Sequence, residues 1–158
     1  MYQSNPAENP DLIQDVQNFH TKFDLKARQP GTPIDIDRLR FRIRFLAEEL
    51  KEINHAAAKG DLPELLDGLV DLVYVAIGTA RDLNLNFAEG WDRVQEANMA
   101  KVPASAENPS PRGHVTDIVK PAGWTPPNHK DLFSELDLLH ARLTTQNELV
   151  DLTAYMAA

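Results

Sequence analysis

The chain contains no cysteine. Disulfides, thiolate nucleophiles and thiolate zinc sites are therefore excluded, and the protein needs no oxidising compartment. Its seven glycines are scattered, so the chain has neither a P-loop nor a dinucleotide-binding fingerprint, and phosphate groups cannot be held by a glycine-rich loop. No segment approaches the ~20 uninterrupted apolar residues of a membrane helix, and residues 1–10 lack the pattern of a signal peptide. We expect no membrane partner and a cytoplasmic location.

Positive charge is also scarce. The 158 residues include 16 lysines and arginines against 24 acidic residues, which gives a formal charge of −8. Such a surface repels polyanions, so duplex nucleic acid is not an expected partner. A small anionic substrate remains compatible with it if metal ions bridge the acidic residues to the substrate. The length and the 42 % hydrophobic content suit one domain with its own core.

Apolar residues recur at helical spacing along most of the chain. The spacing predicts helices over 11–23, 35–59, 62–83 and 86–101, a helix in the tail from 130, and a further short turn over 147–156. Between them, 102–128 holds six prolines, too many for regular structure, and only a short extended piece around 115–119 fits there. We predict an all-α fold with a four-helix bundle core at 1–101, a Pro-rich arm at 102–129 and a C-terminal helical extension at 130–158.

Three glutamates lie together on the second predicted helix. At ~100° per residue, the side chains of Glu48, Glu49 and Glu52 share one face, within reach of a common cation. An ordinary solvated stripe explains them equally well, because glutamate is a good helix former and is usually exposed. The glutamates alone do not identify a site.

Two aspartates on the third predicted helix strengthen the case. This helix is apolar on nearly every side, the pattern of a central, buried helix, and Asp67 and Asp71 lie four residues apart within it. An unpaired carboxylate would be costly there. Either the aspartates mark one exposed edge, or arginines of the second helix pair with them, or they bind metal.

Packing of these two helices side by side would bring all five carboxylates together. Their mutual repulsion would raise their pKa values unless divalent cations neutralised them. Oxygen ligands without cysteine or a histidine cluster indicate Mg²⁺, with Mn²⁺ as a substitute.

Asn98 and Lys101, at the end of the fourth predicted helix, are candidates for binding substrate. The amide suits a sugar or a base and the ammonium suits a phosphate. They are equally compatible with an ordinary helix C-terminus. The five histidines show no metal-ligand spacing and are interpreted as surface or packing residues.

Several motifs, in order, resemble the MazG-like all-α nucleoside triphosphate pyrophosphohydrolases, which are related to dimeric dUTPases and to phosphoribosyl-ATP pyrophosphohydrolase. The resemblance covers about two thirds of the chain. It is carried by Phe19-His20, Arg42, the stretch 48–52, the stretch 67–74 with 78–80, the stretch 98–101, Lys120-Pro121-Ala122-Gly123-Trp124 and Pro126-Pro127.

The family pattern is Glu-x-x-Glu on one helix and Glu-x-x-Asp on the next. The first half maps onto Glu49 and Glu52, with Glu48 as an additional acid. In the second half Asp71 matches, but Gly68 occupies the glutamate position and Asp67 stands one residue earlier. The resemblance assigns the missing carboxylate to Asp67, and this departure leaves the number of metals open.

The resemblance implies Mg²⁺-dependent hydrolysis of a (deoxy)nucleoside triphosphate at the α-phosphorus, giving the monophosphate and pyrophosphate in the control of nucleotide pools. It implies metal ligation by Glu48, Glu49, Glu52, Asp67 and Asp71, with Glu48 or Glu49 as the base, and substrate binding by Arg42, Tyr74, Asn98, Lys101, Lys120 and Trp124. It also implies a homodimer, or a tetramer made of two dimers.

Two other interpretations remain open. One is phosphoribosyl-ATP pyrophosphohydrolase activity, which uses the same kind of acidic site. The other is a non-catalytic acidic helical interaction protein, which requires acids in phosphate-like rows on the surface and leaves aspartates in the most apolar helix unexplained. The sequence does not indicate which base or sugar is preferred.

Overall fold

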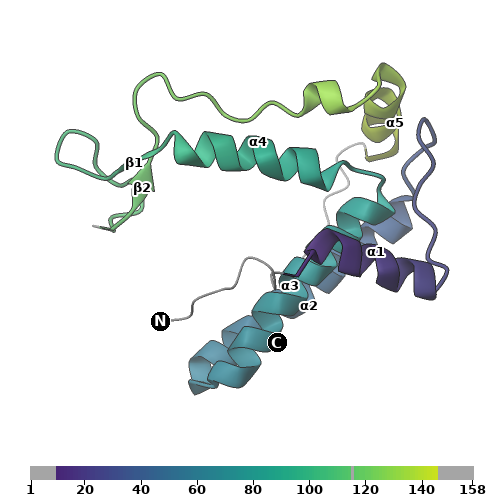
Figure 1. The fold of residues 1–158 in the computed structure, drawn as a ribbon, viewed down its shortest axis with the longest axis horizontal. Helices are drawn as coiled ribbons and strands as arrows, with labels where there is room; N and C mark the ends of the chain where they lie inside the picture. Colours follow the sequence, from purple (N-terminus) through teal and green to yellow (C-terminus); the bar gives the residue numbers. More distant parts are fainter. Residues whose placement is uncertain (1–9, 115, 146–158) are drawn as a thin grey trace. The chain divides into compact units, whose positions relative to one another are not determined.

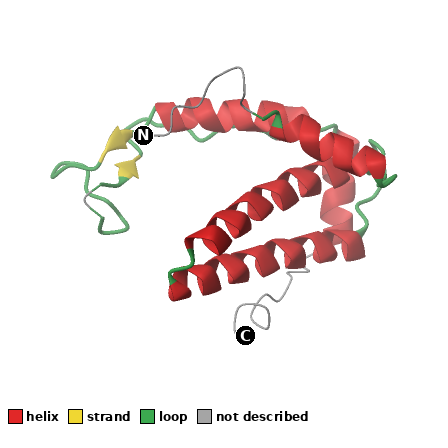
Figure 2. Ribbon diagram, turned by 60° about the horizontal axis from the view of Figure 1, so that its bottom comes forward, coloured by secondary structure: helices red, strands yellow, loops and turns green. Residues whose placement is uncertain are grey.

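The computed structural model describes residues 10–114 and 116–145. Within them the protein is mostly helical and has one two-stranded sheet (Figures 1 and 2). Its elements are α1 (Leu12–Lys22), α2 (Ile36–Lys59), α3 (Leu62–Asp82), α4 (Phe87–Met99), β1 (Val102–Pro103), β2 (Ile118–Val119), the 3-10 helix η2 (Lys130–Leu132) and α5 (Glu135–Thr145). The predicted all-α class is confirmed, whereas the turn predicted over 147–156 falls outside the described residues. None of the described helices is long and apolar enough to cross a membrane.

The ends of α2 and α3 follow from local sequence signals. The side chain of Asp35 accepts hydrogen bonds from two backbone N–H groups of the first turn of α2. Gly60 ends this helix in the left-handed conformation, with φ of 68°, which glycine adopts without a steric penalty. The side chain of Asp61 then caps α3, with Pro63 in the first turn. The helix end predicted at residue 59 and the helix start predicted at residue 62 are therefore confirmed.

The chain forms two compact units: the described parts of Met1–Leu85 and Ser134–Ala158 make up the first, and Asn86–Phe133 makes up the second. The first unit contains α1, α2, α3 and α5. The second contains α4 together with the Pro-rich segment and the small sheet, so α4 clusters with the segment that follows it.

In the first unit, α2 and α3 run antiparallel and side by side (Figure 2). Their close approach depends on Gly68 of α3, which is buried: a Cβ atom there would lie 3.0 Å from Cγ1 and 3.4 Å from the backbone nitrogen of Ile53 on α2. Glycine at this position brings the two helix backbones together near the turn that connects them.

A buried polar network holds the other end of this pair. Asp82, 5 % exposed, accepts a 2.7 Å hydrogen bond from Arg38 and lies 3.7 Å from Nε of Arg42. Its Oδ1 atom lies 3.5 Å from Nδ1 of His20, a buried residue of α1 that also contacts Arg81 at 3.0 Å. One carboxylate thus faces two guanidinium groups and an imidazole, and it joins α1 and α2 to the end of α3.

Burial of the His20 ring favours its neutral form. Burial lowers the pKa of this imidazole, the nearby Asp82 carboxylate raises it, and the surrounding arginines lower it again. The interpretation of this histidine as a packing residue agrees with its 3 % exposure. Gly78 leaves the space that the network needs, because a Cβ atom there would lie 2.8 Å from Arg42 and 3.2 Å from the His20 ring.

Helix α5 is attached through its first turn. Ser134 and Asp137 cap the helix reciprocally, because the Asp137 N–H donates to the Ser134 hydroxyl and that hydroxyl donates to the Asp137 carboxylate. The same carboxylate accepts a 2.8 Å hydrogen bond from Arg28 and one from the backbone N–H of Gly31. These three donors hold the pKa of Asp137 well below its usual range.

The expectation that α3 is buried on nearly every side was wrong for the single chain. Its side away from α2 is exposed. The exposed side chains are those of Leu62, Leu66, Leu69, Val70 and Val73, at 72, 64, 47, 55 and 45 %. The apolar sequence reflects this second face, which the other described elements of the first unit leave exposed.

In the second unit, the Pro-rich segment returns along α4. Strands β1 and β2 pair antiparallel, with Val102 opposite Val119, and so close the loop between them. Further along, Arg93 of α4 donates to the backbone oxygen of Asn128 and to both carboxylate oxygens of Asp131. The strand pairing falls partly within the extended piece predicted around 115–119.

Candidate active site

Five carboxylates are grouped where α2 and α3 pack against each other. Glu48, Glu49 and Glu52 come from α2, and Asp67 and Asp71 from α3, on either side of the Gly68 contact. Glu49 is buried, at 6 % exposure, and the other four carboxylates are exposed. One acid therefore lies in the helix interface, and the other four lie at the solvent edge.

The Glu49 carboxylate lies close enough to the other four carboxylates for their charges to shift its pKa. Burial raises the pKa of Glu49, and the charges of Glu52, Asp71, Glu48 and Asp67, in decreasing order, raise it further. Contributions from both helices confirm that the predicted side-by-side packing brings the two acidic stretches together.

Glu49 lacks the cation that a buried carboxylate normally needs. Among the described residues, the structure gives this carboxylate neither a hydrogen bond nor an ion-pair partner. A divalent cation would supply the missing positive charge, and an all-oxygen donor set suits Mg²⁺ or Mn²⁺. The residues therefore fit a metal, although no group of three or more acids or histidines in the described ranges is already arranged to hold one.

Asp67 and Asp71 are both exposed. Of the alternatives that the sequence left open, their exposure agrees with one exposed edge on α3 rather than with burial inside the helix pair. The acid whose burial costs free energy is Glu49, on the more polar helix α2. The spacing of apolar residues could not show that Glu49 is the buried acid. The second apolar side of α3, which faces away from α2, made the whole of α3 look buried in the sequence.

Gly68 explains the departure from the family pattern. A glutamate at this position would have to place its Cβ atom within 3.0 Å of Ile53. A real Cβ atom almost never lies closer than that, so the Ile53 side chain would have to move. In this chain the position serves the close packing of α2 on α3, and the carboxylate nearest to it on α3 is Asp67.

Two other predicted substrate-binding residues of the first unit make contacts within it. Arg42 donates to the backbone oxygen of Val75 at 2.8 Å and to the hydroxyl of Thr79 at 3.1 Å. The Tyr74 ring packs edge-on against Phe19 of α1, with the ring centres 5.6 Å apart. Arg42 thus fastens α2 to α3, and Tyr74 lies between the acidic stretch and α1.

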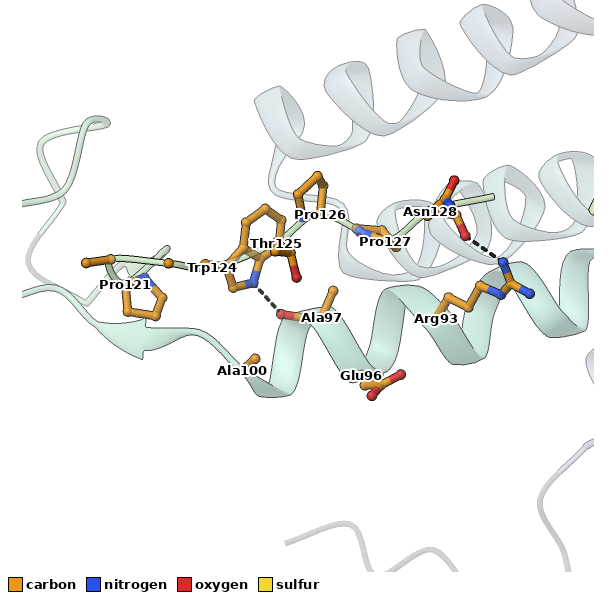
Figure 3. A pocket seen from close by; sticks show the side chains of 12 residues that line it. Arg93, Glu96, Ala97, Ala100, Pro121, Trp124, Thr125, Pro126, Pro127 and Asn128 are labelled. Atoms are coloured by element: carbon orange, nitrogen blue, oxygen red, sulfur yellow. Dashed lines mark hydrogen bonds between the residues drawn. The ribbon is translucent and has the colours of Figure 1, made fainter. Parts of the chain in front are cut away.

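The remaining predicted residues lie in the second unit, and three of them are in contact. The Trp124 indole donates from Nε1 to the backbone oxygen of Ala97 at 2.8 Å (Figure 3). The ammonium groups of Lys101 and Lys120 lie 5.8 and 4.6 Å from the centre of the Trp124 ring. Asn98 is exposed in the last turn of α4.

The sequence analysis missed residues of two kinds. Asp82 organises the buried network. The sequence contained a signal for this residue, because Asp82 lies on the same face of its helix as Gly78, opposite Arg38 and Arg42. Arg112, which lines a pocket beside Lys101 and Lys120, had no such signal because it lies in an irregular loop.

The family model described as phosphoribosyl-ATP pyrophosphohydrolase matches residues 16–98. That range includes all five carboxylates and ends before the Pro-rich segment. No curated protein matches the chain. The resemblance to the MazG-like all-α superfamily, of which this family is part, is thereby confirmed, and with it the class of a pyrophosphohydrolase acting on a nucleotide-like substrate.

Proposed function

Because the chain belongs to the phosphoribosyl-ATP pyrophosphohydrolase family, we propose that it hydrolyses a (deoxy)nucleoside triphosphate to the monophosphate and pyrophosphate with Mg²⁺. The observation that carries this proposal is Glu49, a buried carboxylate without a cation in a field of four others. Such a site attracts a divalent cation. Without bound metal it would repel a negatively charged polyphosphate. The proposed role is control of the nucleotide pool.

The roles of the acids follow from their positions. Glu49, Glu52 and Asp71 would hold the metal, with Asp67 in reach from α3. Glu48, exposed on α2, would accept the proton of the attacking water. Bound Mg²⁺ supplies charge neutralisation at the phosphate oxygens and lowers the pKa of water.

The test is pyrophosphate release from eight ribo- and deoxyribonucleoside triphosphates with Mg²⁺ or Mn²⁺. We expect metal-dependent release from one or a few of them, with the monophosphate as the other product. Release of orthophosphate in its place would exclude cleavage between the α- and β-phosphates. Activity that is unchanged by EDTA would overturn the role of the metal.

The family match favours one second candidate, hydrolysis of phosphoribosyl-ATP. The same carboxylates would hold the metal for hydrolysis of the same kind of phosphoanhydride bond. Only the part of the substrate beyond the phosphates differs, and the matched range stops at residue 98. Phosphoribosyl-ATP therefore belongs in the panel, and turnover of it alone would replace the triphosphate proposal.

We also propose that two copies of the chain pair through the exposed face of α3, alone or as half of a tetramer. The five apolar side chains of that face form a continuous stripe opposite the side that packs on α2. We expect Leu66→Glu, at a 64 % exposed position, to reduce the mass measured by light scattering to that of one chain, with helicity by circular dichroism retained.

The variant Leu139→Glu tests the rival face, since Leu136, Leu139 and Leu143 form an exposed stripe on α5. We expect it to leave the mass unchanged. If Leu139→Glu dissociates the protein and Leu66→Glu does not, the pairing face is α5 and our assignment to α3 is wrong.

A further inference from the structure

The guanidinium of Arg42 is occupied within the first unit. It donates from Nη2 to the backbone oxygen of Val75 at 2.8 Å and from Nε to the hydroxyl of Thr79 at 3.1 Å. The Nε atom also lies 3.7 Å from the buried carboxylate of Asp82, and the Arg42 side chain is 11 % exposed. At both nitrogens a phosphate group would have to displace an existing partner, so this side chain is better placed to hold the helices together than to bind substrate.

Thr79 completes the attachment of Arg42 to α3. Its hydroxyl accepts the hydrogen bond from Arg42 and donates its own proton to the Val75 oxygen at 2.7 Å. That oxygen therefore receives one side-chain donor from each helix. Gly78 leaves room for the guanidinium, because a Cβ atom there would lie 2.8 Å from Nη2 of Arg42. The planar fork of an arginine fits this pair of acceptors, and the single ammonium group of a lysine does not.

Two contacts fix how α2 is aligned with α3. The first joins Ile53 to Gly68, and the second joins Arg42 to Thr79. The two contacts are eleven residues apart on each helix. Since both helices rise by about 1.5 Å per residue, α2 and α3 keep one constant alignment between these contacts. The first contact limits how closely the backbones approach, and the hydrogen bonds of the second oppose sliding along the helix axis.

The buried carboxylate of the acidic group lies between the two contacts. Glu49 is four residues before Ile53 on α2, which places it level with residues 71–72 of α3. Burial is the largest cause of the raised pKa of Glu49, and the charge of Asp71 adds to it, which agrees with this alignment. Arg42 precedes Glu49 by about two helical turns on the same side of α2. A slide of α2 at Arg42 would therefore carry Glu49 past Asp71.

We propose that Arg42 is a positioning residue, which holds α2 along α3 so that Glu49 and Asp71 reach the same metal ion, and that it does not touch the substrate. The identification of the bound group as a metal rests on the proposed function, but the role of Arg42 depends on neither the base nor the sugar of the nucleotide. A misplacement of about 1 Å can lower a rate by ~10²-fold, and a slide by one residue would displace Glu49 by about 1.5 Å. The two hydrogen bonds of Arg42 should therefore affect metal binding from two turns away.

The test measures binding of Mn²⁺ to the full chain without nucleotide, from the paramagnetic resonance signal of the free ion. Arg42→Lys keeps the positive charge and removes the planar fork. Thr79→Val keeps the shape of the side chain and removes the hydroxyl, whereas Thr79→Ser retains the hydroxyl. The matched control is Arg40→Lys, which changes an arginine of the same helix whose guanidinium lies 3.3 Å from Asp37.

We expect Arg42→Lys and Thr79→Val each to raise the Kd of Mn²⁺ by about tenfold or more, the loss that is usual when a partner outside the ligand shell is removed. Thr79→Ser and Arg40→Lys should bind Mn²⁺ like the wild-type protein. Circular dichroism should show unchanged helicity, and if Arg42→Lys unfolds, the comparison of Thr79→Val with Thr79→Ser decides. With saturating metal, kcat for the triphosphate should fall more than KM rises, because no contact to the substrate is lost.

The proposal is overturned if the folded variants Arg42→Lys and Thr79→Val bind Mn²⁺ as tightly as the wild-type protein, or if the wild-type protein binds none. A raised KM for the triphosphate with unchanged Mn²⁺ affinity would mean that Arg42 contacts the substrate.

Failure of the proposed function gives a different result. Pyrophosphate release by the wild-type protein, with Mn²⁺ affinity unaltered in the variants, would retain the enzyme and exclude the positioning role. Weakened Mn²⁺ binding in the variants, without hydrolysis of any nucleotide by the wild-type protein, would retain the positioning role and exclude the enzyme.

Discussion

Replacing Glu49 by glutamine is expected to lower the rate of pyrophosphate release by about 10²-fold or more, because loss of a metal ligand weakens a charge stabilisation that contributes several kcal/mol. The same change is expected to raise the melting temperature of the metal-free protein. The buried carboxylate costs folding free energy because it is desolvated and repelled by four neighbours, and the amide is uncharged. For a chain of this size, each kcal/mol gained would raise Tm by about 2–4 °C.

The pH dependence follows from the raised pKa of Glu49. In the unfolded chain this group ionises near pH ~4, whereas in the folded chain it keeps its proton to a higher pH. Between the two pKa values the folded state binds more protons, so the free energy of unfolding falls as pH rises. The advantage of Glu49→Gln should be small at pH 4, grow through this window and then stay constant.

The control for this experiment is Glu64→Gln, which removes an exposed glutamate of α3 outside the five acids. It should retain activity and show no such pH-dependent gain. Mg²⁺ should stabilise the wild-type protein more than Glu49→Gln. Equal stabilisation of both by Mg²⁺ would mean that Glu49 does not face the metal.

Asp82→Asn is expected to give the largest loss of stability. The substitution keeps the size of the side chain but removes the charge that faces Arg38 and Arg42, as well as His20. Removing one partner of a buried ion pair costs about 3–5 kcal/mol, because the remaining charges stay buried without compensation. Thermal and urea unfolding at neutral pH would measure the loss.

The comparison variant is Asp37→Asn, whose carboxylate is 90 % exposed and lies 3.3 Å from a guanidinium nitrogen of Arg40. Exposed pairs of this kind contribute about 0–1 kcal/mol. If the two variants unfold at the same urea concentration, Asp82 does not organise a buried network.

Much of the fold was predictable because its signals are local. Helices α2 and α3 begin at aspartate caps and are separated by a glycine with positive φ, and each of these features depends on a few consecutive residues. The grouping of Glu49 with Asp71 was also predictable. It requires only that two adjacent helices pack as an antiparallel pair.

Other features depend on contacts between distant parts of the chain. Apolar residues all around α3 could indicate burial within one chain or a face left for another, and only the structure shows the 64 % exposure of Leu66. Likewise, Arg112 lines a pocket with Lys101 and Lys120 because an irregular loop returns to β1. Neither the exposure of Leu66 nor the position of Arg112 is determined by the spacing of apolar residues in the sequence.

The contact between Gly68 and Ile53 also constrains how this protein can evolve. The family's glutamate at position 68 would place its Cβ atom 3.0 Å from Ile53, so the substitution should cost stability unless the Ile53 side chain shifts. A smaller residue at position 53 would relieve the contact, but by itself it would leave a gap between the helices. We therefore expect the two positions to be coupled, so that relatives with an acid at 68 carry a smaller or reoriented residue at 53.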